Sequence, residues 1–206
     1  MFTGFVTDQG EIIAAEERSS GRYFKIATAY DAQSIDIGAS ISCNGCCLTV
    51  TELSAAGEPN WFAVEAWAEA LELTNAAQWQ VGSIINLERS LKHGDEYGGH
   101  MVSGHVDGMA EIVGVKAEGD ATRFTLKAPD ALSKYIVPKG SVTLDGTSLT
   151  VNDVNGAIFD VLIIRHTLEV TTWGNLREGN QVNLEVDQIA RYVVSIVERQ
   201  QTNSST

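Results

Sequence analysis

The sequence has no long apolar run, few cysteines and few prolines. Among its 206 residues are only three prolines and three cysteines, and no segment approaches the ~18 consecutive apolar residues of a membrane-spanning helix. The first ten residues, MFTGFVTDQG, have neither the basic region nor the long apolar region of a secretory signal. We therefore expect a cytoplasmic protein with no membrane partner.

Positive charge is also scarce. The chain has 14 Lys and Arg residues against 27 Asp and Glu residues, which gives a formal net charge of -13. Such a surface repels phosphate backbones, so we expect no nucleic-acid partner. A hydrophobic content of 44% suffices for a buried core, and the length suits one large domain or two of about 100 residues.

The three cysteines lie within one stretch, SCNGCCLTV at residues 42–50. The spacing of Cys43 and Cys46 occurs in zinc sites, but a structural zinc site needs four ligands, usually as two pairs. The chain has no second cysteine pair, and a redox pair belongs in a thioredoxin-like βαβ setting that this sequence lacks. We expect no metal, and we interpret Cys43 and Cys46 as small buried hydrophobic residues.

The sequence repeats itself at an offset of about 100 residues. Four blocks match in the same order, namely residues 4–7 with 104–107, residues 45–50 (GCCLTV) with 146–151 (GTSLTV), residues 71–74 with 168–171, and residues 81–88 with 178–185. A period this long indicates duplicated domains rather than a solenoid. We assign residues 1–97 to the first copy and residues 98–187 to the second.

Each copy has the pattern of short strands. Residues 22–27 and 122–127 alternate polar and apolar side chains with a period of two, and so do residues 84–87 and 181–186. Turns rich in Gly, Asn and Asp separate the strands about every 8–12 residues. The sequence therefore predicts an all-β fold with one small closed barrel in each copy, since closure leaves no exposed strand edge.

One segment, residues 188–200, lies outside the repeat. Its apolar residues recur on one face at helical spacing, at Ile189, Val193, Ile196 and Val197. Asp187 is suited to cap the helix. The apolar face needs a partner, either the barrels of the same chain or the same helix of another subunit. We expect residues 201–206, which are polar, to form a disordered tail.

Differences between the two copies point to candidate functional residues. Cys47 aligns with Ser148, so each copy carries one small nucleophilic or hydrogen-bonding side chain at the same position. Two residues further on, Thr49 and Thr150 lie on the same face of the same strands. This arrangement predicts two related pockets.

A glycine-rich segment with two histidines, GGHMVSGHVDG at residues 98–108, begins the second copy. It does not match a phosphate-binding loop, because no helix with a Lys-Ser/Thr pair follows it. A single histidine is more often a structural hydrogen-bonding group than a catalyst. His105, however, aligns with Phe5, so the fold does not require a histidine there.

Five motifs in this order resemble the riboflavin synthase family of the two-barrel kind. They are MFTGFV, NGCCLTV, GGHMVSGHVDG, KGSVTLDGTSLTVN and a closing VNLEVD followed by a helix. The resemblance covers residues 1 to about 198. It implies two similar six-stranded antiparallel Greek-key barrels, and a homotrimer joined through the C-terminal helices. It also implies an active site between the first barrel of one chain and the second barrel of its neighbour.

The resemblance implies the final step of riboflavin biosynthesis. Two molecules of 6,7-dimethyl-8-ribityllumazine bind, and one gives a four-carbon unit to the other, which yields riboflavin and 5-amino-6-(D-ribitylamino)uracil. No cofactor or metal takes part. Docking to lumazine synthase, which makes the substrate, stays open. The alternative is a non-catalytic lumazine- or flavin-binding protein on the same scaffold, but the intact SGH and DGTSLT motifs favour catalysis.

Carried over position by position, the family's functional residues fall on both copies. The candidates for catalysis are Phe2, Ser40, Cys47, Thr49, His105, Lys139, Ser148, Thr150 and Asp187. The candidates for substrate binding are Gly4, Phe5, Val6, Cys47, Leu48, Thr49, Glu65, Ala66, Trp67, Ala68, Glu69, Ala70, Gly104, His105, Val106, Lys139, Ser148, Leu149, Thr150, Ile164, Arg165, His166, Thr167, Leu168 and Glu169.

The roles of these residues stay open at this point. Cys47 is a candidate for an adding nucleophile or a polar wall, and His105 and Ser148 are candidates for proton transfer. Three positions, in two places, depart from the family pattern. Ala70 stands where many members have threonine, and Arg165 and His166 stand where some members have Pro-Glu.

Overall fold

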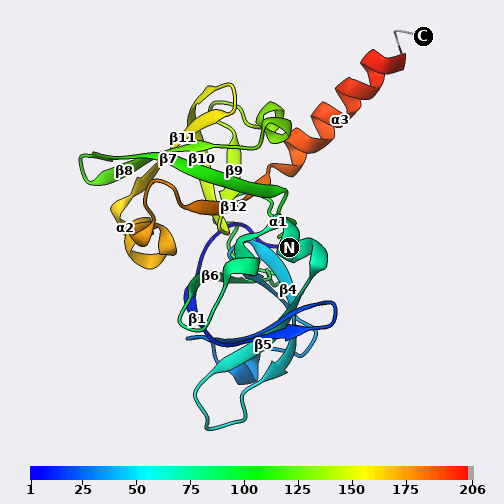
Figure 1. The fold of residues 1–206 in the computed structure, drawn as a ribbon, viewed down its shortest axis with the longest axis vertical. Helices are drawn as coiled ribbons and strands as arrows, with labels where there is room; N and C mark the ends of the chain where they lie inside the picture. The colour runs from blue at the N-terminus through cyan, green and yellow to red at the C-terminus, as the bar shows by residue number, and fades with distance from the viewer. Residues whose placement is uncertain (204–206) are drawn as a thin grey trace.

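The computed structural model describes residues 1–203, which form two β-barrels, one above the other in Figure 1, and a projecting terminal helix. The first barrel consists of β1 (Asp8–Arg18), β2 (Gly21–Ala27), β3 (Ser40–Cys43), β4 (Cys46–Leu53), β5 (Trp61–Trp67) and β6 (Ile84–Arg89). The second consists of β7 (Gly108–Glu118), β8 (Ala121–Lys127), β9 (Ser141–Leu144), β10 (Thr147–Asn155), β11 (Ile158–Ile164) and β12 (Gln181–Val186).

Both barrels are closed and antiparallel. The strand order is β1-β2-β5-β4-β3-β6 in the first barrel, and the second has the equivalent order β7-β8-β11-β10-β9-β12. Three consecutive strands pair as hairpins, β3-β4-β5, and β6 returns beside β3, which is the Greek-key arrangement. The predicted all-β fold with two duplicated barrels is confirmed.

Short helical segments connect the strands at equivalent places. The α-helices α1 (Ala68–Leu73) and α2 (Arg165–Val170) follow β5 and β11, and the 3-10 turns η2 (Asn75–Gln78) and η4 (Thr172–Asn175) come next. The other 3-10 turns are η1 (Ala32–Ser34) and η3 (Asp130–Tyr135). A threonine caps the start of η2 and of η4. The side chains of Thr74 and Thr171 accept the backbone N–H group two residues further along the chain.

Each barrel has its own hydrophobic core with a tryptophan at one end. The ring of Trp79 meets Phe24 edge-on at 5.2 Å, and Trp173 meets Phe124 in the same way at 4.9 Å. Trp173 aligns with Ala76, not with Trp79. The two copies therefore fill equivalent space from different positions of the same turn, as a core does when total volume is kept.

Strand alternation separates the three cysteines. Cys43 and Cys46 point into the core of the first barrel and are buried, whereas Cys47 is partly exposed on the outer face of β4. Burial raises the pKa of Cys43, and it raises the pKa of Cys46 to about 12. These two cysteines are core residues, as predicted, and they are protonated and unreactive.

The barrels meet through two tight turns of the repeat. The ideal Cβ position of Gly45 would lie 2.8 Å from the Gly146 nitrogen, so the turns pack backbone against backbone. Asn86 donates a side-chain N–H to the Asp145 carbonyl at 2.8 Å, and Asn183 donates one to the Asn44 carbonyl at 2.8 Å. These reciprocal bonds fix the two barrels relative to each other.

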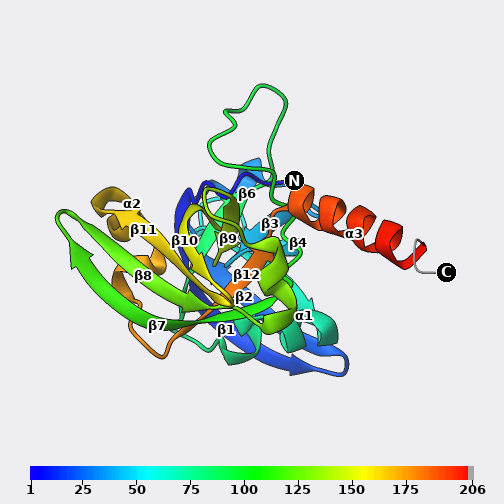
Figure 2. The same ribbon diagram turned by 90° about the horizontal axis from the view of Figure 1, so that it is seen from above.

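Helix α3 (Gln188–Asn203) leaves the second barrel and projects from the body of the molecule (Figures 1 and 2). It includes residues 201–203, which we expected to be disordered, and the remaining residues of that predicted tail, 204–206, lie outside the described residues. Asp187 caps it as predicted, accepting the Ile189 N–H at 2.7 Å. Its large exposed apolar side chains are Ile189, Tyr192, Val193, Ile196 and Val197.

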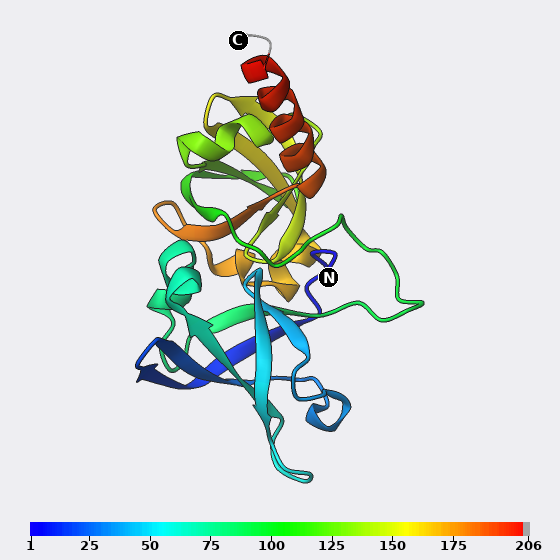
Figure 3. The same ribbon diagram turned by 90° about the vertical axis from the view of Figure 1, so that its right-hand side faces the viewer.

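The connection between the barrels, residues 90–99, is a loop whose middle projects from the body of the molecule (Figures 2 and 3), while Gly99 at its end packs against Thr3 and Ser148. The N-terminus lies close to the junction of the barrels (Figure 3). Among residues 1–203, no helix is both long and apolar enough to span a bilayer.

Candidate functional site

The two copies exchange the loops that precede their first strands. The Gly4 carbonyl accepts the N–H of Ser148 in β10 at 2.8 Å, and the Gly104 carbonyl accepts the N–H of Cys47 in β4 at 2.8 Å. Phe2 and Val102 pair between these loops through two backbone hydrogen bonds. Each candidate pocket is therefore built from one barrel and the loop of the other copy.

Only glycine fits where each loop crosses the opposite strand. Gly4 and Gly104 have φ angles of +77° and +79°, which other residues rarely adopt. A Cβ atom on Gly4 would lie 2.6 Å from the Ser148 Cβ, and one on Gly104 would lie 2.5 Å from the Cys47 Cβ. The glycines bring the loop backbone directly onto the two residues that align in the repeat.

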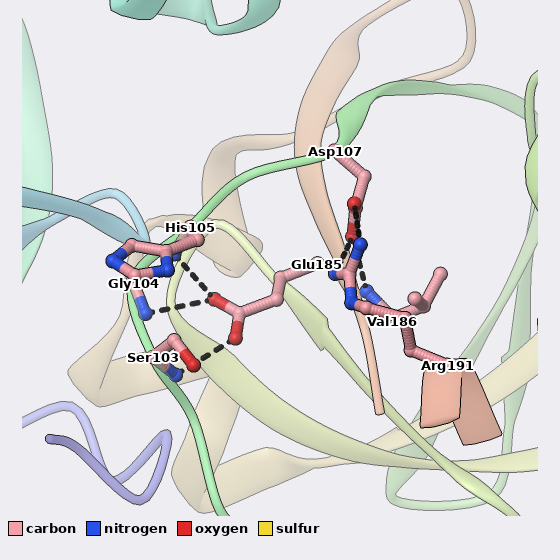
Figure 4. A network of polar contacts seen from close by, with 7 residues as sticks. All are labelled: Ser103, Gly104, His105, Asp107, Glu185, Val186 and Arg191. Atoms are coloured by element: carbon pink, nitrogen blue, oxygen red, sulfur yellow. Dashed lines mark hydrogen bonds and ion pairs between the residues drawn. The ribbon is translucent and has the colours of Figure 1, made fainter. Parts of the chain in front are cut away.

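A buried glutamate holds each loop. Glu88 accepts the N–H groups of Thr3 and Gly4 at 2.7 and 2.9 Å. Glu185 accepts the N–H groups of Ser103, Gly104 and His105 at 2.7 to 3.0 Å (Figure 4). Burial raises the pKa of both carboxyl groups, and that of Glu185 reaches about 7. The N–H bonds oppose this rise because they favour the charged form.

The first pocket is a cavity of about 310 Å³ beside β4 and α1. Its walls are Cys46, Cys47, Glu69, Ala70, Leu73, Thr74, Gly104, His105 and Val106. His105 is exposed at the mouth, on the loop held by Glu185. The volume lies in the range of small-molecule sites, and a thiol, an imidazole and a carboxylate converge on it.

The second pocket is a cavity of about 440 Å³ beside β10 and α2. Its walls are Gly4, Phe5, Val6, Thr7, Gly98, Thr147, Ser148, His166, Thr167, Val170 and Thr171. Most of these residues occupy the repeat positions of the first-pocket walls. Phe5 takes the place of His105, and Thr167 takes the place of Ala70.

Ser148 has a histidine partner that the sequence analysis did not single out. The His100 Nδ1 lies 2.7 Å from the Ser148 Oγ, and its Nε2 lies 3.2 Å from the Thr143 Oγ1. Burial lowers the pKa of His100, against the opposite effect of the nearby Asp187 carboxylate. The imidazole is thus neutral at pH 7 and able to accept the serine hydrogen.

Comparison with known proteins identifies the family. The family model described as Lumazine binding domain matches the chain twice, at residues 3–90 and 103–187. Riboflavin synthase of Brucella abortus (strain 2308) is 58% identical over 201 residues, which cover 97% of this chain and 100% of that protein. The chain belongs to the riboflavin synthase family.

Two solved structures share the fold. LumP complexed with riboflavin superimposes with a TM-score of 0.80 at 23% identity and covers 90% of this chain and 99% of that one. LumP complexed with 6,7-dimethyl-8-(1'-D-ribityl) lumazine gives a TM-score of 0.78 at 22% identity with the same coverage. At these identities the likeness concerns the two-barrel fold alone.

The riboflavin synthase motifs place several predicted residues on the outer faces of β4 and β10. Thr49 follows Cys47 on this face and pairs with Ser40 of β3, while Thr150 follows Ser148. Both threonines are exposed. Leu48 and Leu149, also predicted to bind substrate, point the other way into the barrel cores. A role of these two leucines in binding stays a prediction.

Lys139 has a backbone conformation that its side chain does not favour. Its φ is 65°, whereas the equivalent position of the first copy is Gly38 with φ of 89°. Lys139 donates its N–H to the Val151 carbonyl in β10, and Gly38 donates its N–H to the Val50 carbonyl in β4, both at 2.8 Å. A lysine in place of glycine at this turn costs stability, and such strain is typical of functional positions.

Other predicted residues lie further from the two cavities. Glu65, Ala66 and Trp67 border a separate hollow of about 190 Å³ beside the hairpin of residues 18–22. Arg165 pairs with Glu169 at 2.7 Å on the exposed side of α2. The remaining positions are the exposed Ile164 and Ala68 and the partly buried Leu168. Their roles in binding stay predictions.

Phe2 is completely buried between the two exchanged loops. Its ring lies next to Gly104, which is a wall of the first pocket. In the part of the chain that the structure describes, no three His, Cys, Asp or Glu side chains cluster as a metal site would require.

Proposed function

We propose that the two pockets of this riboflavin synthase divide the reaction between a proton-removing site and an electrophile-binding site. The enzyme transfers a four-carbon unit between two identical lumazine molecules, so it must treat the same molecule in two ways. The observation that carries the proposal is the equivalence of Cys47 and Ser148 on one duplicated frame, with only Ser148 hydrogen-bonded to a histidine.

The second pocket is suited to proton removal. The 7-methyl group of the bound lumazine is acidic because its anion delocalises into the ring system. A neutral His100 accepts the Ser148 hydrogen at Nδ1. As the serine oxygen takes up a methyl proton, its own proton passes to His100 Nδ1. At the same time its Nε2–H donates to Thr143, which fixes the ring orientation.

The first pocket is suited to hold the other lumazine as an electrophile. The Cys47 thiol and the His105 ring line the same cavity as Glu69, and none of the three is fully buried. A thiol can add to the lumazine ring or form a polar wall against it. Proximity supplies much of the catalysis, since two bulky rings must stack in one orientation.

We infer that the working form is an assembly of chains, a homotrimer as in the family resemblance. Helices α1 and α2, which flank the two pockets, lie on opposite sides of the junction between the barrels (Figures 1 and 2). Ligands bound on opposite sides of the junction do not face each other within one chain. The reaction therefore requires that the first pocket of one chain meets the second pocket of another. The apolar face of α3 is suited to join the chains.

Truncation tests this assembly. A chain ending after Asp187 lacks α3 and is expected to be monomeric by light scattering, with little activity even at high protein concentration. A trimer that survives the truncation would refute the role of α3. A cytoplasmic location and docking to lumazine synthase stay predictions, and co-purification of the two proteins from a cell extract tests the second.

Turnover decides between an enzyme and a binding protein. The purified protein is incubated with 6,7-dimethyl-8-ribityllumazine, and flavin absorbance is followed together with release of the diaminouracil product in equal amount. Tight lumazine binding without flavin formation would instead support the non-catalytic alternative. Metal analysis of the same sample provides a control for the absence of a zinc requirement.

A further inference from the structure

The loop that carries His105 is attached to helix α3 by an ion pair. Arg191, in the first turns of α3, donates from Nη1 and Nη2 to both carboxylate oxygens of Asp107, at 2.7 and 2.8 Å (Figure 4). The Asp107 side chain is 11% exposed and that of Arg191 is 39% exposed. A two-pronged pair with one partner largely buried holds its geometry better than a surface ion pair does.

Asp107 also fixes the loop to the end of β12. Its Oδ2 accepts the N–H of Val186 at 2.9 Å, while the preceding residue, Glu185, accepts the loop N–H groups of residues 103–105. Two successive residues of β12 thus hold the loop at its two ends. Arg191 completes the second attachment from outside the barrel.

The first copy lacks this attachment. Thr7 stands at the position of Asp107 and makes the same backbone bond, its N–H donating to Leu87 at 3.0 Å as that of Asp107 donates to Leu184 at 2.8 Å. The Thr7 hydroxyl pairs with the Tyr30 hydroxyl instead of an arginine. The ion pair is therefore an addition to the duplicated frame, not a requirement of it.

We propose that Arg191 is a positioning residue of the first pocket, which holds the His105 loop in place through Asp107. The proposal rests on the proposed function, in which His105 and Gly104 form a wall of the active site. Helix α3 then contributes to the pocket within its own chain, separately from any contact it makes with other chains. Without the pair, residues 103–107 keep their bonds to Glu185 and to the barrel backbone but lose their link to α3.

The test compares three variants of the full-length protein. Arg191→Gln removes the charge, Arg191→Lys keeps it without the fork, and Lys134→Met serves as a matched control. Lys134 makes another ion pair with α3, to Glu198 at 2.6 Å, and this pair does not include the loop residues 103–107. Far-UV circular dichroism and light scattering establish that fold and assembly are unchanged.

Kinetics and hydrogen exchange then report on the loop. We expect Arg191→Gln to lower kcat/KM roughly tenfold, since a small misplacement of a pocket wall has effects of this order. Arg191→Lys should recover at least half of the loss, and Lys134→Met should be within about twofold of the parent. Amide exchange in the peptide covering residues 103–107 should be faster in Arg191→Gln only.

Two outcomes overturn the proposal. One is an Arg191→Gln protein with parental kcat/KM and parental exchange in residues 103–107. The other is a loss of activity that disappears when the protein concentration is raised, because the helix would then act through assembly alone. If the parent itself does not form flavin, the proposed function fails, but the exchange rates still report on the attachment.

Discussion

The two pockets share a frame and differ in chemistry. In both, a glycine loop from the other copy crosses a strand, and a buried glutamate holds that loop. In the second pocket the residue under the loop is Ser148 with His100 behind it, while in the first it is Cys47 with His105 at the mouth. The repeated residues build the same pocket frame in both barrels. The residues that differ between the copies give the two pockets different chemical groups.

Contacts that are present in one copy and missing from the other indicate functional residues in a duplicated protein. His100 and the Arg191–Asp107 pair have no counterpart in the contacts of the first copy, and each touches a pocket or the loop that forms it. A residue that repeats serves the fold of both barrels. A residue that stands at one pocket only is a candidate for the step performed there.

Of the substitutions that separate the two pockets, the replacement of His100 should lower kcat the most. The His100→Gln variant keeps a polar side chain but cannot take a proton from Ser148, so we expect kcat to fall roughly 10²- to 10³-fold. Binding of riboflavin, followed by fluorescence, should change little at either pocket. The exposed His93 in the connecting loop provides the matched control as His93→Gln, and a kcat loss below threefold for His100→Gln would remove the histidine from the mechanism.

Exchanging the two aligned residues should have the next largest effect. Ser148→Cys places a poor hydrogen-bonding group against His100 and should lower kcat roughly a hundredfold, whereas Cys47→Ser should cost roughly tenfold. The double exchange should not restore activity, because His100 stays with the second barrel. Equal losses from the two single changes, measured by single-turnover flavin formation, would show that the pockets are interchangeable.

Much of this arrangement could be predicted from the sequence, because the two copies can be aligned with each other along the chain. The match of residues 45–50 with 146–151 located both central hairpins and paired Cys47 with Ser148. Period-two alternation predicted that Thr49 lies on the same face of its strand as Cys47. The amphipathic spacing in residues 188–200 predicted α3, although not its last turn.

The contacts between the copies could not be predicted in the same way. His100 and Ser148 are 48 positions apart, and Arg191 and Asp107 are 84 apart. Their meeting depends on where the exchanged loops cross the barrels, which no local pattern specifies. The buried glutamates were visible only as part of the repeat, and the raised pKa of Glu185 depends on burial that appears only in three dimensions.

The turn residue Asp145 should show a pH dependence that its twin, Asn44, lacks. Burial raises the pKa of Asp145 to about 7 in the folded chain, from an ordinary value of 3.8. A carboxyl pKa raised by folding gives stability that is complete below about pH 4 and is lost as the pH rises through 7. In Asp145→Asn the melting temperature should depend less on pH over this range. The free energy of unfolding at pH 8 should rise by at most about 4 kcal/mol.

The reverse change provides the control for that experiment. Asn44→Asp places a second carboxylate in the turn that packs against the turn of Asp145, so it should destabilise the protein at pH 8 more than at pH 5. Thermal unfolding at both pH values measures the effect. A pH dependence that is the same in the parent and in Asp145→Asn would contradict the assignment to this residue.

A substitution at Lys139 should have the smallest effect on stability. It should change stability and activity in opposite directions. Lys139→Gly copies Gly38 of the first barrel, and it should stabilise the protein by about 0.5 to 1 kcal/mol, since relief of the left-handed backbone exceeds the added chain entropy. Gly38→Ala should destabilise it by a similar amount. Activity should fall in Lys139→Gly in spite of the higher melting temperature, because the amine of a predicted catalytic residue is lost. A variant that is both more stable and fully active would mean that the strain at Lys139 serves no step of the reaction.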